Sequence, residues 1–129
     1  MEKDFQSWHN KKARIDQIPK RPFFREQEIW FCHLGANVGF EQDGSGEEFL
    51  RPVLIFRKFN NEIFWGIPLT KTNKTSKFYF RFSFLPGIES SAVLSQIRLI
   101  DARRLARNIG YLPKDKFREL IQKLKELFP

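Results

Sequence analysis

The amino-acid sequence predicts a mainly β fold: a small barrel of short consecutive strands with a helix at its C-terminal end. Short runs rich in β-branched and aromatic residues, separated by turn residues, recur from residue 28 to residue 97. Residues 77–84 alternate strictly between phenylalanine and more polar side chains. Residues 117–128 repeat apolar side chains at the spacing of one helix face. Consecutive short strands that curl on themselves close into a barrel.

Composition narrows the class of protein. The 129 residues suffice for one domain, and a hydrophobic content of 41% with 15 Phe indicates a globular chain. No apolar run reaches the roughly 20 residues that span a bilayer, and the first residues lack the apolar segment of a signal peptide. The single Cys excludes an internal disulfide, so we expect a cytoplasmic protein that does not bind a membrane.

The chain is basic, with a net charge of +8 and a pI of about 9.9. The Lys and Arg excess lies at the two ends, because residues 28–96 contain equal numbers of acidic and basic side chains. Such a surface suits a polyanionic partner such as nucleic acid. A solubilising shell of charge is the alternative interpretation.

The N-terminal residues 1–27 are predicted to form an extension, and residues 28–129 the barrel domain. Residues 3–17 are weakly helical in pattern, with Phe5, Trp8 and Ile15 on one stripe, and prolines follow at 19 and 22. We expect this extension to pack on the barrel through Phe5, Trp8, Phe23 and Phe24. A partly disordered arm is the alternative.

The first strands of the barrel are predicted at 28–34, 51–58 and 62–69. The first ends at Gly35 and is followed by a glycine-rich, acidic loop of about 15 residues over 35–49. The second and third form a hairpin around Asn60-Asn61.

Residues 77–84 predict a further strand whose Phe78, Phe80, Phe82 and Phe84 face the core. The opposite face, with Lys77, Tyr79 and Arg81, either contacts nucleic acid by stacking and phosphate binding or is simply solvated. Pro86-Gly87 predicts a turn and residues 92–97 the next strand.

Two helices are predicted after the last strand. Asp101 is a good N-cap for a short helix over about 102–108, and Gly110 lies just beyond its end. Pro113 suits the first turn of the C-terminal helix, which carries the apolar stripe from Phe117 to Phe128.

The strongest candidates for functional residues are Arg51 and Thr70, at the outer ends of the predicted hairpin strands. Folding the hairpin brings these two ends side by side, so a guanidinium and a hydroxyl meet at one sheet edge. An arginine can hold a phosphate by two parallel hydrogen bonds. The alternatives are an ion pair of Arg51 with Glu47 or Glu48, and an ordinary edge-strand role for Thr70.

Other chemistries find little support in the sequence. His33 lies in a strand without a supporting acid or nucleophile at useful spacing, and Cys32 has no neighbouring base. His9, His33 and Cys32 do not have the spacing of zinc ligands, so we expect no metal and no cofactor. Gly44-Ser45-Gly46 is too short for a phosphate-binding loop.

An ordered set of short sequence blocks in this chain resembles the MazF/PemK family of toxins. The N-terminal extension over residues 1–27 resembles that of a PemK-like subgroup. The blocks are Glu28-Ile29-Trp30, Gly39-Phe40-Glu41-Gln42, Arg51-Pro52-Val53-Leu54, Pro68-Leu69-Thr70, Ser95-Gln96-Ile97-Arg98-Leu99-Ile100-Asp101, Arg104-Leu105 and Ile109-Gly110. The resemblance implies an SH3-like barrel and a homodimer. It also implies a metal-independent, sequence-specific endoribonuclease that cuts single-stranded RNA, often mRNA, at short sequences. A cognate antitoxin protein is implied to neutralise it.

The resemblance also implies roles for individual residues. Arg51 and Thr70 match the family's catalytic arginine and threonine. The remaining matches and candidates concern RNA binding or positioning: Gln96, Ser95, Glu41, Gln42, Lys71, Lys77, Tyr79 and Arg81. Some PemK-type members act through an Arg-Cys-Asp run or a histidine; this chain has Val93-Leu94-Ser95 and Phe40 instead.

Two other functions remain open at this point. A gyrase poison like CcdB uses the same barrel without an Arg51/Thr70 pair. A non-catalytic module that binds single-stranded nucleic acid through Lys77, Tyr79 and Arg81 is the second. Either alternative predicts that Arg51→Ala leaves function largely intact.

Overall fold

The barrel and its C-terminal helix are both present in a computed structural model that describes residues 21–34, 50–71 and 75–129. The elements in chain order are β1 (Glu28–His33), β2 (Leu50–Lys58), β3 (Ile63–Thr70), β4 (Tyr79–Leu85), β5 (Ile88–Val93), the 3₁₀ turn η1 (Leu94–Gln96), β6 (Arg98–Asp101), the 3₁₀ turn η2 (Ala102–Arg104), β7 (Leu105–Tyr111) and α2 (Lys114–Lys125). None of the helices described is long and apolar enough to cross a membrane.

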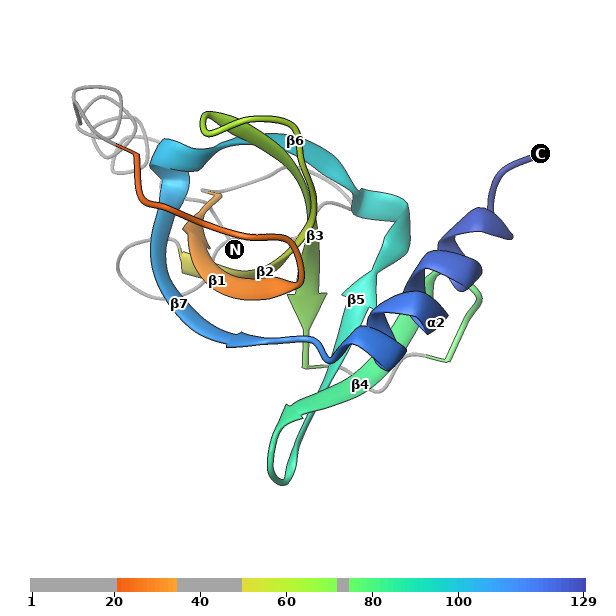
Figure 1. Cartoon of the computed structure of the whole chain (residues 1–129). Coiled ribbons are helices and arrows are strands. Elements are labelled where there is room, and N and C mark those ends of the chain that lie inside the picture. Colours follow the sequence, from red (N-terminus) through yellow and green to blue (C-terminus); the bar gives the residue numbers. More distant parts are fainter. Residues whose placement is uncertain (1–20, 35–49, 72–74) are drawn as a thin grey trace, which may run out of the picture.

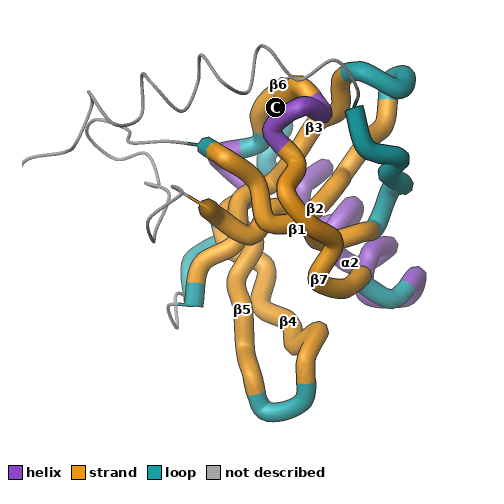
Figure 2. Tube along the Cα trace, turned by 90° about the vertical axis from the view of Figure 1, so that its left-hand side faces the viewer, coloured by secondary structure: helices purple, strands orange, loops and turns teal. Residues whose placement is uncertain are grey.

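Five strands curl into the barrel, and two more form a hairpin beside it (Figure 1). All pairings are antiparallel: β1 lies between β2 and β7, and β3 lies between β2 and β6. The far end of β3 leaves the barrel and pairs with β5, which pairs with β4. The β4–β5 hairpin therefore projects from one side of the molecule (Figure 2). β3 is the strand shared by the barrel and the hairpin.

The barrel strands β1, β2 and β3 are buried on both faces over most of their length, which explains their nearly continuous apolar sequences. One cluster fills the barrel; its members include Trp30, Cys32, Val53, Ile55 and Phe64. The second cluster lies between the outer side of these strands, the β4–β5 hairpin and α2, and contains Ile29, Leu54, Ile67, Phe80, Phe82, Phe117 and Leu120. Alternate residues along each strand join alternate clusters, as the period of a strand requires.

Residues 21–27, which we call the strap, cross the end of the barrel that faces the viewer in Figure 1. Phe24 is fully buried in the barrel cluster and packs on Phe64 with ring centroids 5.2 Å apart. Gln27 donates its amide to the Ile55 carbonyl and accepts from the Leu112 amide. The predicted packing of Phe24 is thus present, whereas Phe23 is 69% exposed. Phe5 and Trp8 lie outside the described residues, so the division of the chain at residue 28 stays a prediction.

Much of the predicted order of elements is confirmed. The 51–58 and 62–69 strands are β2 and β3, and Asn60 shapes their turn by accepting from the Glu62 and Ile63 amides at 2.7 and 3.0 Å. The C-terminal helix begins directly after Pro113 and buries Phe117, Leu120 and Leu124. The long loop at 35–49 and the N-terminal helix fall outside the described residues.

Two expected elements are wrong. The strand predicted at 92–97 runs instead from Ile88 to Val93 and is followed by a 3₁₀ turn. The helix predicted at 102–108 is a single 3₁₀ turn, after which Leu105–Tyr111 is a strand paired with β1.

The predicted phenylalanine face is only partly correct. Phe80 and Phe82 are buried in the outer cluster and Phe84 packs against it. Phe78 precedes β4 and is 41% exposed. Phe78 therefore belongs to the alternating sequence but lies one residue before the strand that carries the other three phenylalanines.

Candidate active site

Arg51 and Thr70 occupy neighbouring strand ends. In the β2–β3 register Val53 lies opposite Pro68, and each of the two residues lies two positions beyond this pair, toward the same end of the barrel. Since side chains alternate along a strand and directly opposite residues share a face, Arg51 and Thr70 point to the same face. The backbone therefore places these two strand ends side by side, as the sequence predicted for the hairpin.

Both side chains are half-buried rather than fully solvated. The Arg51 Nε atom is shielded from solvent. Arg51 lies opposite Cys32 in β1, so its strand end sits against the barrel interior. A guanidinium in such a partly dry position interacts more strongly with an anion than one on an open surface.

Two further arginines stand at this end of the barrel. Arg104 donates from Nη1 to the His33 carbonyl at 3.1 Å. Burial raises the pKa of the Cys32 thiol to about 12, and the charges of Arg104 and Arg98 counteract part of that rise. Arg98 begins β6 and lies opposite Gly66, four residues before Thr70 on the same face of β3. Sequence reasoning assigned neither arginine to the site. Arg98 was missed because β6 and its pairing with β3 were not predicted, and Arg104 because the turn after β6 was read as part of a longer helix.

Thr70 belongs to a row of polar residues across three strands. Thr70 in β3 lies opposite Ser91 in β5, and Ser91 lies opposite Arg81 in β4. Ser91 is only 1% exposed, and sequence reasoning did not identify it. Tyr79, two residues from Arg81, lies opposite Val93 on the same face. The hairpin thus brings two of the predicted RNA-contacting residues to the face that carries Thr70.

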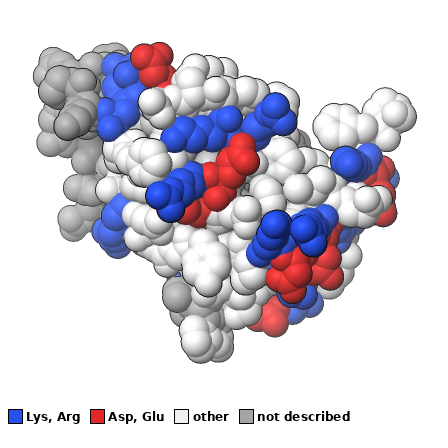
Figure 3. Space-filling model, in the orientation of Figure 1, with Lys and Arg blue, Asp and Glu red and all other residues white. Residues whose placement is uncertain are grey.

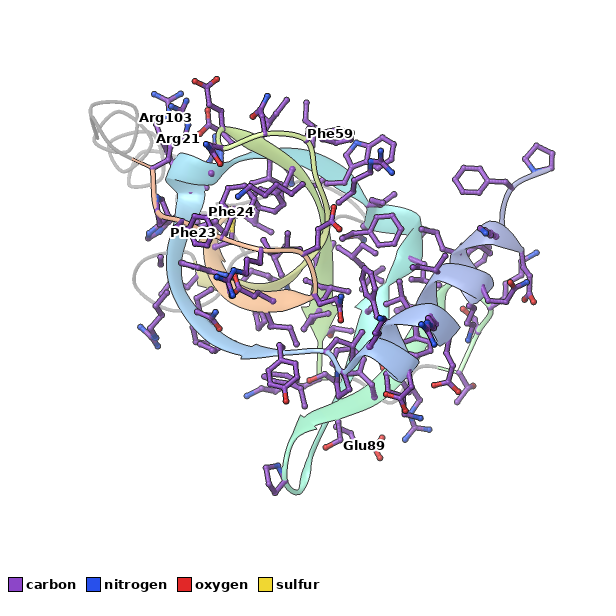
Figure 4. The ribbon with its side chains drawn as sticks, in the orientation of Figure 1. Arg21, Phe23, Phe24, Phe59, Glu89 and Arg103 are labelled. Atoms are coloured by element: carbon purple, nitrogen blue, oxygen red, sulfur yellow. The ribbon has the colours of Figure 1, made fainter. Side chains whose placement is uncertain are left out.

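The remaining predicted residues are placed as follows. Gln96 is half-buried and Ser95 is exposed in η1, which follows β5 directly. Lys71 is exposed next to Thr70, and Lys77 is exposed with its Nζ 5.3 Å from the Phe78 ring centroid. Arg81 forms a 2.7 Å ion pair with Glu89 (labelled in Figure 4). Glu41 and Gln42 lie outside the described residues.

The chemistry available at this strand end is that of fixed cations and hydroxyls. Within residues 21–34, 50–71 and 75–129, no three His, Cys, Asp or Glu side chains gather in a group that could hold a metal ion. His33 is half-buried in β1, and Cys32 is fully buried. The arrangement suits electrostatic stabilisation of an oxyanion such as a phosphate.

A second surface feature is apolar. A hollow of about 380 Å³ lies between the outer face of β2–β3 and the end of α2; it is lined by Phe56, Trp65, Ile97, Ile121, Leu124, Lys125 and Phe128. Trp65 is 41% exposed, contacts Phe59 edge-on at 5.0 Å and lies opposite the 56% exposed Leu99. We call Phe59, Trp65, Leu99 and Phe128 the apolar surface.

Comparison with known proteins gives one family and a set of related folds. Residues 25–128 match the family described as PemK-like, MazF-like toxin of type II toxin–antitoxin system. A search of curated protein sequences gave no match.

Solved structures share the fold at low sequence identity. MazF from Deinococcus radiodurans is 22% identical, with a TM-score of 0.66, over 84% of this chain and 96% of its own. The MazE–MazF complex from the same organism gives 18% and 0.63 over 84% and 95%. The Mycobacterium tuberculosis toxin MazF-mt6 gives 19% and 0.59 over 77% and 93%. These likenesses show that the barrel, hairpin and C-terminal helix form a MazF-type fold.

Proposed function

The chain belongs to the PemK-like, MazF-like toxins of type II toxin–antitoxin systems, and from this premise we propose that it is an endoribonuclease that cuts single-stranded RNA, mRNA included, without a metal ion. The observation that carries the proposal is the meeting of Arg51 and Thr70 at the ends of β2 and β3, with Arg104 bonded to the end of the neighbouring strand β1. A charged strand end of this kind suits the phosphate backbone of a nucleic acid.

The proposed reaction uses a nucleophile from the substrate itself. The ribose 2′-OH attacks the adjacent phosphorus, and the bond from phosphorus to the 5′ oxygen of the next nucleotide breaks. The 2′ proton leaves to a base and a proton reaches the departing oxygen, giving a 2′,3′-cyclic phosphate and a 5′-OH end. Because the 2′-OH is already beside its phosphate, positioning supplies much of the rate enhancement.

The residues of the site would stabilise charge and orient groups. Arg51 would bind the phosphoryl oxygens, whose charge grows in the transition state. Thr70 would orient the 2′-OH or a phosphate oxygen, and Gln96 with Ser95 would position the sugar or base. Six further residues would contact flanking nucleotides: Lys71, Lys77, Tyr79, Arg81, Glu41 and Gln42. Because Arg81 forms an ion pair with Glu89, that pair would have to open before Arg81 could make its contact.

We also propose a homodimer and an antitoxin partner in the cytoplasm. The apolar surface supports the dimer, because contiguous exposed aromatic residues are typical of protein interfaces. One structural neighbour is a MazE–MazF complex and another is an endoribonuclease with its cognate antitoxin, which supports an antitoxin for this chain as well.

The test is cleavage of a long single-stranded RNA in excess EDTA, with the product ends mapped. We expect discrete cuts with 5′-OH ends from the wild type, and a loss of about 100-fold or more in rate from Arg51→Ala. Arg118→Ala, an exposed arginine on α2, is the matched control and should cut like the wild type.

Two outcomes would contradict the proposal. One is intact RNA with wild-type protein that is free of co-purified antitoxin. The other is full cleavage by a folded Arg51→Ala variant, which would leave RNA cleavage possible but remove Arg51 from it.

A further inference from the structure

The strap carries an exposed aromatic ring between two cations. Phe23 is 69% exposed, the largest exposed fraction among the bulky apolar side chains of the described residues. The Arg25 guanidinium carbon lies 5.2 Å from its ring centroid, and the Lys58 Nζ lies 4.6 Å from it. Figure 4 shows Phe23 beside the buried Phe24 at the end of the barrel.

The backbone beneath this ring is firmly held. Phe24 is buried beneath it, and Lys58 Nζ donates to the Phe24 carbonyl at 2.8 Å. The Glu26 carboxylate accepts from the Lys58 amide at 2.7 Å, and the Glu28 carboxylate accepts from the Arg25 amide at 2.8 Å. The two neighbouring acids are therefore occupied by backbone amides, and the exposed ring and its cations are presented on an ordered base.

The surroundings of Phe23 continue the same pairing of aromatic rings with cations. Phe59 follows Lys58, and the Arg57 guanidinium carbon lies 5.8 Å from its ring centroid. Tyr111, at the strap end of β7, is 66% exposed. Bands of Lys and Arg cross the face of the molecule that carries the strap (Figure 3).

This surface lies at the opposite end of the barrel from Arg51. Arg51 is the second residue of β2 and Lys58 is its last, so the two are about 23 Å apart along the strand. The outer side of β1 and β7 connects the two ends. On it the Arg107 guanidinium carbon lies 4.7 Å from the Phe31 ring centroid, and Phe31 lies opposite Pro52, next to Arg51.

We propose that the strap is a second binding site for single-stranded RNA, outside the site of cleavage. A base stacks on Phe23, while Arg25 and Lys58 contact the phosphates on either side of it. Aromatic platforms with flanking cations bind single strands in this way, with little sequence preference. The inference rests on the proposed RNA substrate. It adds a second region of contact, so that the enzyme also binds RNA beyond the few nucleotides around Arg51.

The test is the affinity for a fluorescein-labelled single-stranded RNA of about 20 nucleotides, fully 2′-O-methylated so that no 2′-OH can attack, followed by anisotropy. We expect Phe23→Ala to raise Kd about 10-fold. Phe23→Tyr, which keeps a stacking ring, should bind like the wild type. Arg118→Ala, an exposed substitution on α2, is the control and should bind like the wild type.

Salt dependence gives a second measurement. Lys58→Gln should lower the slope of log Kd against log salt by about one unit, as the loss of one phosphate contact requires. Lys125→Gln on α2 should leave the slope unchanged.

Unchanged binding by Phe23→Ala would overturn the inference, and so would an equal loss in Phe23→Ala and Arg118→Ala. Cleavage of unmodified RNA by the wild type would show that the proposed function survives such a result. Wild-type protein that neither binds nor cuts RNA would overturn both proposals together.

Discussion

Asp101 is the residue through which the strap is tied to the barrel wall. Its carboxylate accepts from Arg21 at two positions, both 3.1 Å, and from the Arg103 amide and guanidinium at 2.8 to 3.2 Å. Arg21 and Arg103 lie side by side in Figure 4. Partial burial by itself would raise the pKa of Asp101, but the hydrogen bonds from the two arginines outweigh it and lower that pKa below its ordinary value.

A depressed carboxylate pKa makes folding stability depend on pH in a defined direction. The contribution of Asp101 is present above the carboxylate's unfolded pKa, near 4, and is lost as pH falls below it. We expect Asp101→Asn to lower the free energy of unfolding at pH 7 by about 1 kcal/mol. The difference from wild type should shrink as pH falls below about 4.

Urea unfolding at pH 7 and at pH 3 measures this difference. Glu119→Gln is the control, since Glu119 forms only an exposed pair with Lys116 on α2. A deficit in Asp101→Asn that stays constant between the two pH values would show that the carboxylate charge is not what the arginines stabilise.

At the scale of single residues, the sequence predicted the juxtaposition of those candidate residues that a local turn brings together. Asn60 closes the hairpin as its residue type predicts, so Arg51 and Thr70 followed from the chain itself. Ser91 could not be placed, because it reaches Thr70 only through the pairing of β5 with the end of β3. That pairing is fixed by burial of the hairpin against the outer cluster rather than by any local pattern.

At the scale of an element, the strap behaves as part of the barrel. It supplies a fully buried ring to the interior cluster, and its backbone bonds to both β2 and the residue after β7. A segment that fills a barrel end with a large side chain contributes to stability as a core strand does.

Phe24 and Phe23 offer a matched pair for measuring that contribution. We expect Phe24→Ala to lower the free energy of unfolding by about 3–5 kcal/mol, because it leaves a cavity beside Phe64. Phe23→Ala, one residue earlier and 69% exposed, should change it by less than about 0.5 kcal/mol. Thermal or urea unfolding distinguishes them, and similar stabilities for the two variants would mean that the strap is not part of the core.

The mistaken helix over 102–108 has an identifiable physical cause. Asp101 does cap a turn, as predicted, with its side chain accepting from the Arg103 amide. The chain then leaves the helical path because Leu105–Tyr111 gains backbone pairing with β1, and Leu105 fills the barrel. A local cap signal starts a turn, but contacts distant in sequence decide how the chain continues. The C-terminal helix was predictable because its apolar stripe and the start signal at Pro113 both indicate a helix over the same residues.

At the scale of the whole molecule, several exposed apolar side chains gather in one place. The apolar surface centres on Trp65, and its four side chains together expose roughly 400 Å². A standard interface buries about 800 Å² on each partner. The apolar surface therefore supplies about half of what a stable dimer needs, and a hollow beside projecting rings suits contact with a second copy of itself.

The mass of the protein in solution tests this surface. We expect the wild type to sediment at about twice the 15.4 kDa chain mass. Trp65→Glu should sediment as a monomer, because a charge in the centre of an apolar interface is costly. Tyr111→Glu, a more exposed aromatic on β7, should remain dimeric. A monomeric wild type, or a dimeric Trp65→Glu variant, would contradict the assignment.

Burial of Cys32 inside the barrel has a consequence for how the protein can be handled. Burial raises the pKa of this thiol well above its ordinary value, and no part of the side chain reaches solvent. The protein should therefore resist oxidation and alkylation without added reductant. A cysteine introduced at an exposed helix position such as Gln122 would be the single reactive thiol, so one fluorophore could be attached there without first removing the natural cysteine.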